Sequence, residues 1–204
     1  MENKIKQIFF ELKQHVPFTA LATIIAILIT LSILYFLKKT ISKDIFHLFH
    51  FLHIIASAMV TAGIFYKYKS QLISALVVGI LGAIIIGSLS DVIFPYFGWI
   101  FLNLDIHFHL PLIEETIPVL FSALIGGLAG ILTRTTKYPH FIHVFLSVFA
   151  SLFYLLVFSL VFSLSYFIAT FFIVFGAVII PCCLSDIVFP FFFLPKRNDR
   201  FLKS

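Results

Sequence analysis

Two copies of a histidine pair, each followed by an aspartate, are the residues of this chain best suited to metal chemistry. Each copy opens with an HxxH pair and closes with an LSDxxFP motif. The members are His50, His53 and Asp91 in the first copy and His140, His143 and Asp186 in the second. The HxxH spacing places both imidazoles of a pair on one face of a helix. Two imidazoles and one carboxylate form a common ligand set for Zn, Fe or Mn that leaves coordination positions open.

A proline four residues after each aspartate predicts a helix break beside the carboxylate. Pro95 and Pro190 lack the N–H group that would bond the aspartate carbonyl, and their rings crowd that carbonyl. We therefore expect a freed backbone oxygen next to each carboxylate. Broken helix ends of this kind hold cations at membrane depth.

Further candidate ligands lie close to both copies of the motif. A connection between two apolar segments carries His107, His109, Glu114 and Glu115, and His47 precedes the first HxxH pair. These residues predict a metal-capture vestibule or a second ligand set, with an ordinary solvated acidic loop as the alternative. Cys182 and Cys183 precede Asp186 and are either soft ligands or small buried residues.

The composition of the chain restricts the class of protein that holds these residues. Of 204 residues, 61% are hydrophobic and only 11% are charged, whereas soluble proteins average about 45–50% apolar and about 25% charged residues. A chain of this size cannot bury so many apolar residues in the core of a soluble domain. We therefore expect an all-α polytopic membrane protein and exclude a soluble enzyme. The net charge is +5. In a membrane protein the basic residues mostly report orientation, so nucleic acid is not an expected partner.

Six apolar segments have the approximate length of a membrane-spanning helix. They are residues 17–37, 45–66, 72–97, 117–132, 139–160 and 165–189. Residues 1–16 carry one apolar stripe at helical spacing and predict an interfacial amphipathic helix.

An internal repeat organises these segments. The motif of residues 89–95 recurs at residues 184–190 with five of seven residues identical, and the HxxH pair recurs at an offset of 90. Each repeat contains three spans, an odd number, so the halves must be inverted across the membrane, as in many secondary transporters. The predicted units are residues 1–16 (interfacial helix), 17–98 (first repeat), 99–116 (outer connection), 117–195 (second repeat) and 196–204 (basic cytoplasmic tail).

The distribution of basic residues predicts the orientation. With both termini in the cytoplasm, eleven Lys and Arg residues lie inside and three lie outside. We therefore expect a multi-pass protein of the cell membrane, the inner membrane in a bacterial cell. This topology predicts that the first His and Asp set lies near the outer face and the second near the inner face.

Three functions remain open. The favoured one is a transporter or channel for a divalent transition-metal cation. The second is an intramembrane enzyme that uses a metal or haem, with His53 and His143 as haem ligands, and it requires the two halves to converge on one site. The third is a structural accessory subunit. Expected partners are the lipid bilayer and a metal ion, together with a homo-oligomer or a membrane complex.

Overall fold

The computed structural model describes residues 2–36, 41–133, 137–159 and 166–183. Over these ranges the chain forms helices and no β-strand, apart from one isolated antiparallel bridge between Ile106 and Ser159. The α-helices are α1 (Glu2–Tyr35), α2 (Lys43–Tyr68), α3 (Leu72–Ser88), α4 (Phe94–Phe101), α5 (Pro111–Glu114), α6 (Thr116–Thr133), α7 (Lys137–Phe158) and α8 (Phe167–Val178). Two π-helical segments are η1 (Leu89–Ile93) and η3 (Ile179–Cys183).

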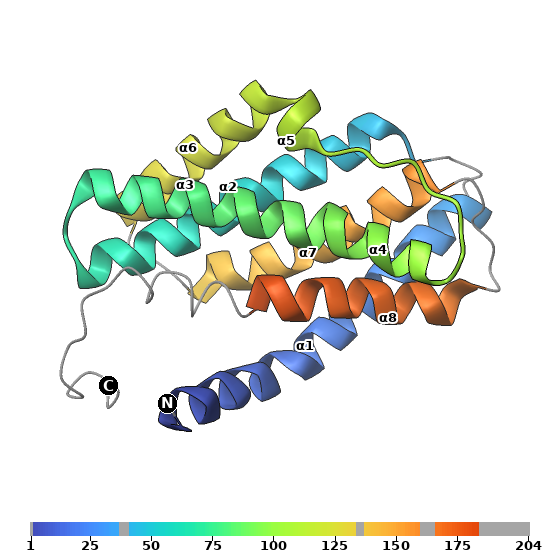
Figure 1. Ribbon diagram of the computed structural model, residues 1–204, viewed down its shortest axis with the longest axis horizontal. Coiled ribbons are helices and arrows are strands. Elements are labelled where there is room, and N and C mark those ends of the chain that lie inside the picture. The colour runs from blue at the N-terminus through green and yellow to red at the C-terminus, as the bar shows by residue number, and fades with distance from the viewer. Residues whose placement is uncertain (1, 37–40, 134–136, 160–165, 184–204) are drawn as a thin grey trace.

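The long helices lie side by side in a bundle, with α1 at its edge (Figure 1). Four of them are long and apolar enough to cross a membrane: Val16–Tyr35, Lys43–Tyr68, Leu72–Phe101 and Thr116–Thr133. Two shorter apolar helices, Ile142–Phe158 and Ile168–Pro181, coincide with the fifth and sixth predicted segments. The all-helical class and its compatibility with a membrane are therefore confirmed, whereas six spans and their inversion remain predictions.

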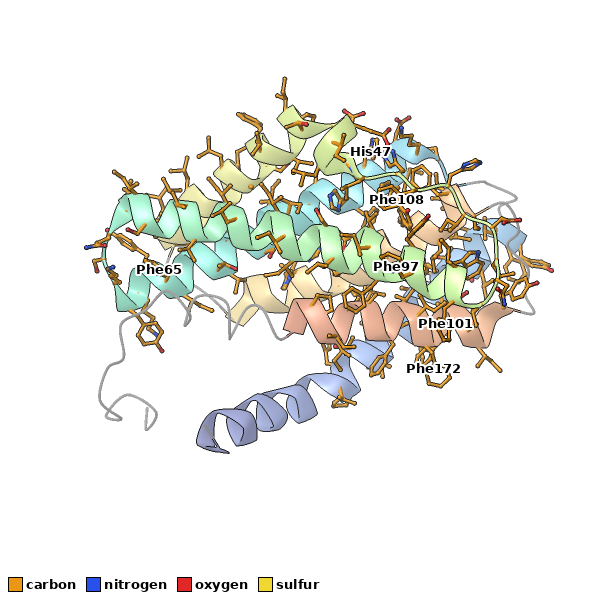
Figure 2. All side chains as sticks on the ribbon, viewed as in Figure 1. His47, Phe65, Phe97, Phe101, Phe108 and Phe172 are labelled. Carbon is orange, nitrogen blue, oxygen red and sulfur yellow. The ribbon has the colours of Figure 1, made fainter. Side chains whose placement is uncertain are left out.

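The surface of the bundle is apolar where α4 lies beside α8. Phe97, Phe101 and Phe172 are mostly exposed there and project from the two helices (Figure 2). A surface groove between the same helices is lined only by apolar residues: Gly98, Phe101, Leu102, Ala169, Phe172 and Ile173. Contiguous apolar surface of this kind suits contact with lipid chains.

The predicted interfacial segment and the first span form one helix. α1 is continuous from Glu2 to Tyr35 and contains Pro17. A proline inside a helix removes one backbone hydrogen bond and can bend the helix without ending it. The boundary predicted at residue 16 is therefore not marked by a loop.

The predicted helix break at Pro95 is replaced by the π-helical segment η1. The N–H of Phe94 donates to the Leu89 carbonyl, five residues earlier, and Pro95 then lies in the first turn of α4. A proline is tolerated in a first turn because its missing N–H has no partner there. The widened turn accommodates the proline, so the helical chain continues through Pro95 while its regular α-helical ladder is interrupted at η1. Pro190 lies outside the described residues.

Helices α2 and α7 pack against each other in an antiparallel arrangement. Phe46, near the start of α2, contacts Tyr154, near the end of α7, with 5.6 Å between ring centroids. Phe49, further along α2, contacts Phe149, with ring centroids 5.3 Å apart. Residue numbers thus rise along α2 while those of their partners fall along α7.

Glycines of α6 allow that helix to approach α2 at backbone distance. A Cβ atom at Gly126 would overlap the carbonyl of Ile55, and a Cβ atom at Gly130 would overlap the carbonyl of Met59. Small residues commonly permit such contacts between membrane helices. Helix α2 is thereby held between α3, α6 and α7, and its position determines where its histidines lie.

Substitution of Gly130 tests this packing. We expect Gly130→Ala to lower the unfolding temperature in detergent, because overpacking a closed contact costs about 1–3 kcal/mol. Gly176→Ala is the matched control, since nothing lies within 4 Å of a Cβ atom placed at Gly176 and alanine favours a helix by up to about 1 kcal/mol over glycine. Equal unfolding temperatures for the two variants would contradict the close approach.

Candidate functional site

Asp91, in η1, is the centre of a fully buried polar cluster. Its Oδ2 lies 2.8 Å from Nδ1 of His50 and 2.7 Å from Nδ1 of His53, both on α2. Its Oδ1 accepts hydrogen bonds from Ser90 Oγ (2.8 Å) and from Ser147 Oγ on α7 (3.1 Å). All five residues have 0% exposure. We call this set, together with His143, the Asp91 cluster.

His143 brings the second half of the chain into the same cluster. Its ring stacks on that of His53, with centroids 4.8 Å apart and an interplanar angle of 19°, and it is also fully buried. The predicted topology separates the two histidine pairs between opposite faces of the membrane. That separation is wrong for His143, because the antiparallel packing of α2 and α7 brings it to the level of His53.

The π-helical segment connects the aspartate to α7. Ser151 Oγ lies 2.9 Å from the carbonyl oxygen of Ser90 and 2.7 Å from that of Ser147. A π turn disrupts the regular bonding ladder of the helix, and a buried carbonyl needs a partner elsewhere. The hydroxyl of Ser151 supplies one, so α7 secures both the backbone and the side chain of the LSD motif.

The carboxylate of Asp91 has no lysine or arginine cation among its described hydrogen-bond partners. Among the described residues its bonded partners are two imidazoles and two hydroxyls, and none is Lys or Arg. A charged group buried in a membrane helix bundle needs compensation. Among the described residues, compensation can come from a proton, held by an imidazole or by the carboxylate itself, or from a bound cation.

One nitrogen of the cluster has no hydrogen-bond partner. An ionised carboxylate only accepts hydrogen bonds, so Nδ1 of His50 is the donor to Asp91, and in the neutral ring Nε2 is an acceptor. His50 Nε2 is buried without a partner, which costs about 1–3 kcal/mol. Imidazoles that bind metal ions usually donate their other nitrogen to a carboxylate. The orientation of His50 is that of a metal ligand with Asp91 behind it.

The predicted ligands of the second half are described only in part. The backbone of His140 belongs to α7 and that of Cys182 and Cys183 to η3, but their side chains, and all of Asp186, lie outside the described part. Within the part that is described, no three His, Cys, Asp or Glu side chains are placed to share a metal ion. The second ligand set therefore stays a prediction.

Two residues of the predicted outer connection, His109 and Glu114, form a second cluster with His47 of α2, which we call the outer cluster. His47 Nε2 lies 2.8 Å from His109 Nε2, and His109 Nδ1 lies 2.6 Å from Glu114 Oε1. Lys43 is 3.6 Å from the other oxygen of Glu114. Burial lowers the pKa of the His109 imidazole below its ordinary value, and the hydrogen bond to Glu114 opposes this.

The other two predicted members take less part in that cluster. The side chain of His107 is exposed, whereas Glu115 is half-buried and acts on His47 and His109 through its charge. His47 lies one helical turn before His50 on α2, close to the outer connection (Figure 2). The outer cluster therefore adjoins the Asp91 cluster along α2.

Sequence reasoning missed the hydroxyl residues of the site. Ser147 lies four residues after His143, and Ser57 lies four residues after His53, so the repeated pattern is HxxHxxxS rather than HxxH. Four residues later the pattern continues with Ser151 in the second half and Thr61 in the first. This extension was visible in the sequence and points to the same helix face.

The described chain is an all-helical bundle with four helices long and apolar enough to cross a membrane and with ionisable residues buried between its helices. Comparisons of the chain with models of known families, with curated proteins and with solved structures find no match. The function is therefore argued from the site alone.

Replacement of Asp91 tests the role of its carboxylate in holding the cluster together. Asp91→Ala leaves two imidazoles and two hydroxyls without their acceptor, and we expect it to lower the free energy of unfolding by about 3–5 kcal/mol, the usual cost of removing one partner of a buried pair. Asp105→Ala, at an exposed position of the outer connection, is the control and should change little. Thermal unfolding of both variants in detergent measures the difference, and equal stabilities would show that the carboxylate does not hold the site.

Proposed function

We propose that the protein is a multi-pass membrane transporter or channel for a divalent transition-metal cation (Zn, Fe or Mn) and that the cation binds at the Asp91 cluster during its passage. The observation that carries this proposal is the buried Nε2 of His50, which has no partner, on a ring whose other nitrogen is held by Asp91. A buried lone pair beside an uncompensated carboxylate suits a soft or borderline cation.

The proposed architecture is a bundle of six spans in two inverted halves, with both termini in the cytoplasm. Two observations support the inversion. Helices α2 and α7, which correspond in the repeat, run antiparallel. His53 and His143 are equivalent by the offset of 90 and contact each other. A residue that contacts its own counterpart is expected near a two-fold axis, so in this proposal the pseudo-symmetry axis passes between these two rings.

The cation is cargo in this proposal, and the chain supplies its ligands from both halves. His50 offers Nε2, while Asp91 orients the ring and balances the charge. His140, His143 and Asp186 are the second-half ligands that the repeat predicts, with Cys182 and Cys183 as soft donors beside Asp186. Binding between inverted halves near the middle of the bundle is the usual arrangement in secondary transporters.

The outer cluster gives this site an external approach. His47, His109 and Glu114 are hydrogen-bonded in a row, and Glu114 is exposed. The three side chains are bonded to one another and are not placed to share one ion in this structure. A cation arriving from outside would have to replace these contacts, one helical turn from His50.

An intramembrane metal enzyme is the second candidate, and the contact between His53 and His143 favours it, because an enzyme needs the halves to converge. The haem variant does not fit the geometry. Ring centroids 4.8 Å apart leave no room for an iron and its porphyrin between the two imidazoles. The enzyme candidate is therefore restricted to a directly bound metal ion.

Metal analysis of purified protein tests the proposal. We expect detergent-purified protein to retain Zn, Fe or Mn and expect His50→Gln and Asp91→Asn to weaken binding about 10- to 100-fold, as second-shell and ligand changes do. His107→Gln is the matched control, since that imidazole is exposed and lies outside both clusters.

Flux measurements in liposomes separate the candidates. Metal uptake by wild-type protein, lost in Asp91→Asn and kept in His107→Gln, is the result that we expect. Metal binding without uptake would favour the enzyme. Protein that neither binds nor moves metal would overturn both candidates and leave the accessory-subunit function.

A further inference from the structure

A polar face of α2 continues from the Asp91 cluster toward the end of the helix that is predicted to lie inside. Ser57 and Thr61 follow His53 at intervals of four residues, and Tyr68 follows Thr61 after seven. These spacings keep the four side chains on one face of the helix. The face extends for about 22 Å at the helical rise of 1.5 Å per residue, and it ends at the surface, because Tyr68 is exposed.

Two hydroxyls on this face are buried without a hydrogen-bond partner. Ser57 and Thr61 have no exposed surface, and neither Ser57 Oγ nor Thr61 Oγ1 makes a hydrogen bond. Buried polar groups are almost always satisfied, and the exceptions mark strain, a functional role, or a site for water or an ion. Each hydroxyl oxygen carries two lone pairs. Two such oxygens one helical turn apart can therefore receive a polar ligand that enters between the helices.

The corresponding face of α7 leads in the opposite direction and is hydrogen-bonded. At the repeat offset of 90 it carries Ser147 and Ser151. Ser147 donates to the carboxylate of Asp91, 3.1 Å away, and Ser151 Oγ lies 2.9 Å from the carbonyl oxygen of Ser90. Because α2 and α7 are antiparallel, the bonded hydroxyls lead outward from the stacked histidines and the unbonded pair leads inward. The two faces together form one polar line through the bundle.

The sides of α2 that face α3 and α6 are apolar and closely packed at this depth. A Cβ atom at Gly79 of α3 would come within 2.7 Å of the Ala62 Cβ atom, and one at Gly130 of α6 would overlap the carbonyl of Met59. Contacts this close leave no room for a hydrated ion against either helix. A polar solute that moves along α2 at this level must therefore follow the polar face.

We propose that Ser57 and Thr61 line the inner half of the cation's route, between the Asp91 cluster and the predicted inner surface. Their hydroxyl oxygens bind the ion, and the water that accompanies it, after it leaves His50 and Asp91. Both hydroxyls are buried in this structure, so the route is closed here and opens only when the helices move apart. This inference rests on the transport function proposed above and assigns a part of the path that the Asp91 cluster does not cover.

Cysteine accessibility tests the route without any metal. In full-length protein with the two native cysteines replaced by alanine, single Ser57→Cys and Thr61→Cys variants are treated in membranes with a charged, membrane-impermeant methanethiosulfonate reagent. The reagent attacks thiolates, and an apolar surrounding suppresses their formation. Ala58→Cys and Ala62→Cys are the matched controls, because these neighbouring positions are equally buried and lie off the polar face.

The reaction rates decide the outcome. We expect Ser57→Cys and Thr61→Cys to react several-fold faster than the two controls in membranes, and all four to react alike after unfolding. Rates equal to those of the controls would overturn the proposal. The route and the proposed function fail separately: reactive cysteines in protein that moves no metal keep a hydrated route and refute metal transport, whereas metal uptake with unreactive cysteines keeps transport and refutes this route.

Removal of the hydroxyls provides a second readout. Ser57→Ala and Thr61→Val should lower metal uptake into liposomes several-fold, while the purified protein keeps its bound metal because the Asp91 cluster is intact. A buried hydroxyl without a partner destabilises the closed structure, so we also expect the unfolding temperature to stay the same or to rise. Unchanged uptake, or lower uptake accompanied by a lower unfolding temperature, would contradict the proposed role.

Discussion

The structure depends on one interaction, the burial of the Asp91 carboxylate among four hydrogen-bond donors. The donors come from α2, α7 and the neighbouring Ser90, so the carboxylate can be satisfied only when both helices and η1 are in register. Leaving any buried member unpartnered is costly in an apolar surrounding. The arrangement of the central helices follows from this requirement.

Two local features make that register attainable. The π-helical segment η1 accommodates Pro95 and places Ser90 and Asp91 against α7. Glycines of α6 let α2 lie deep in the bundle. Because the Asp91 carboxylate is buried, it needs hydrogen-bond donors from the protein. The same burial keeps water away, so a cation bound there would be held by protein atoms. Stability and the proposed cation binding therefore have one physical origin.

Hydrophobic segments and the central residues could be predicted from the sequence. The helices follow the apolar segments within a few residues over most of their length, because a span of lipid requires a fixed length of apolar helix. His50, His53 and Asp91 do lie together, as their repeated pattern predicts. Residue type and spacing sufficed here because each contact lies within one repeat.

Contacts between the repeats could not be predicted in the same way. His143 and Ser147 reach the first half through the antiparallel packing of α2 and α7, and a topology drawn as separate spans assigns no contact between them. The backbone conformation at Pro95 could not be predicted either. The missing N–H of a proline permits the helix to end or to widen into a π turn. The serines of the site could have been predicted from the repeat, which extends to HxxHxxxS. That prediction requires hydroxyl groups to be considered as well as metal ligands.

The central claim is that an imidazole of the Asp91 cluster binds a transition-metal cation. X-ray absorption spectroscopy of zinc-loaded protein tests it most directly. The account predicts nitrogen ligands at about 2.0–2.1 Å with imidazole scattering beyond them, and a smaller imidazole contribution in His50→Gln. A shell of oxygen alone, or a spectrum that His50→Gln leaves unchanged, would contradict it.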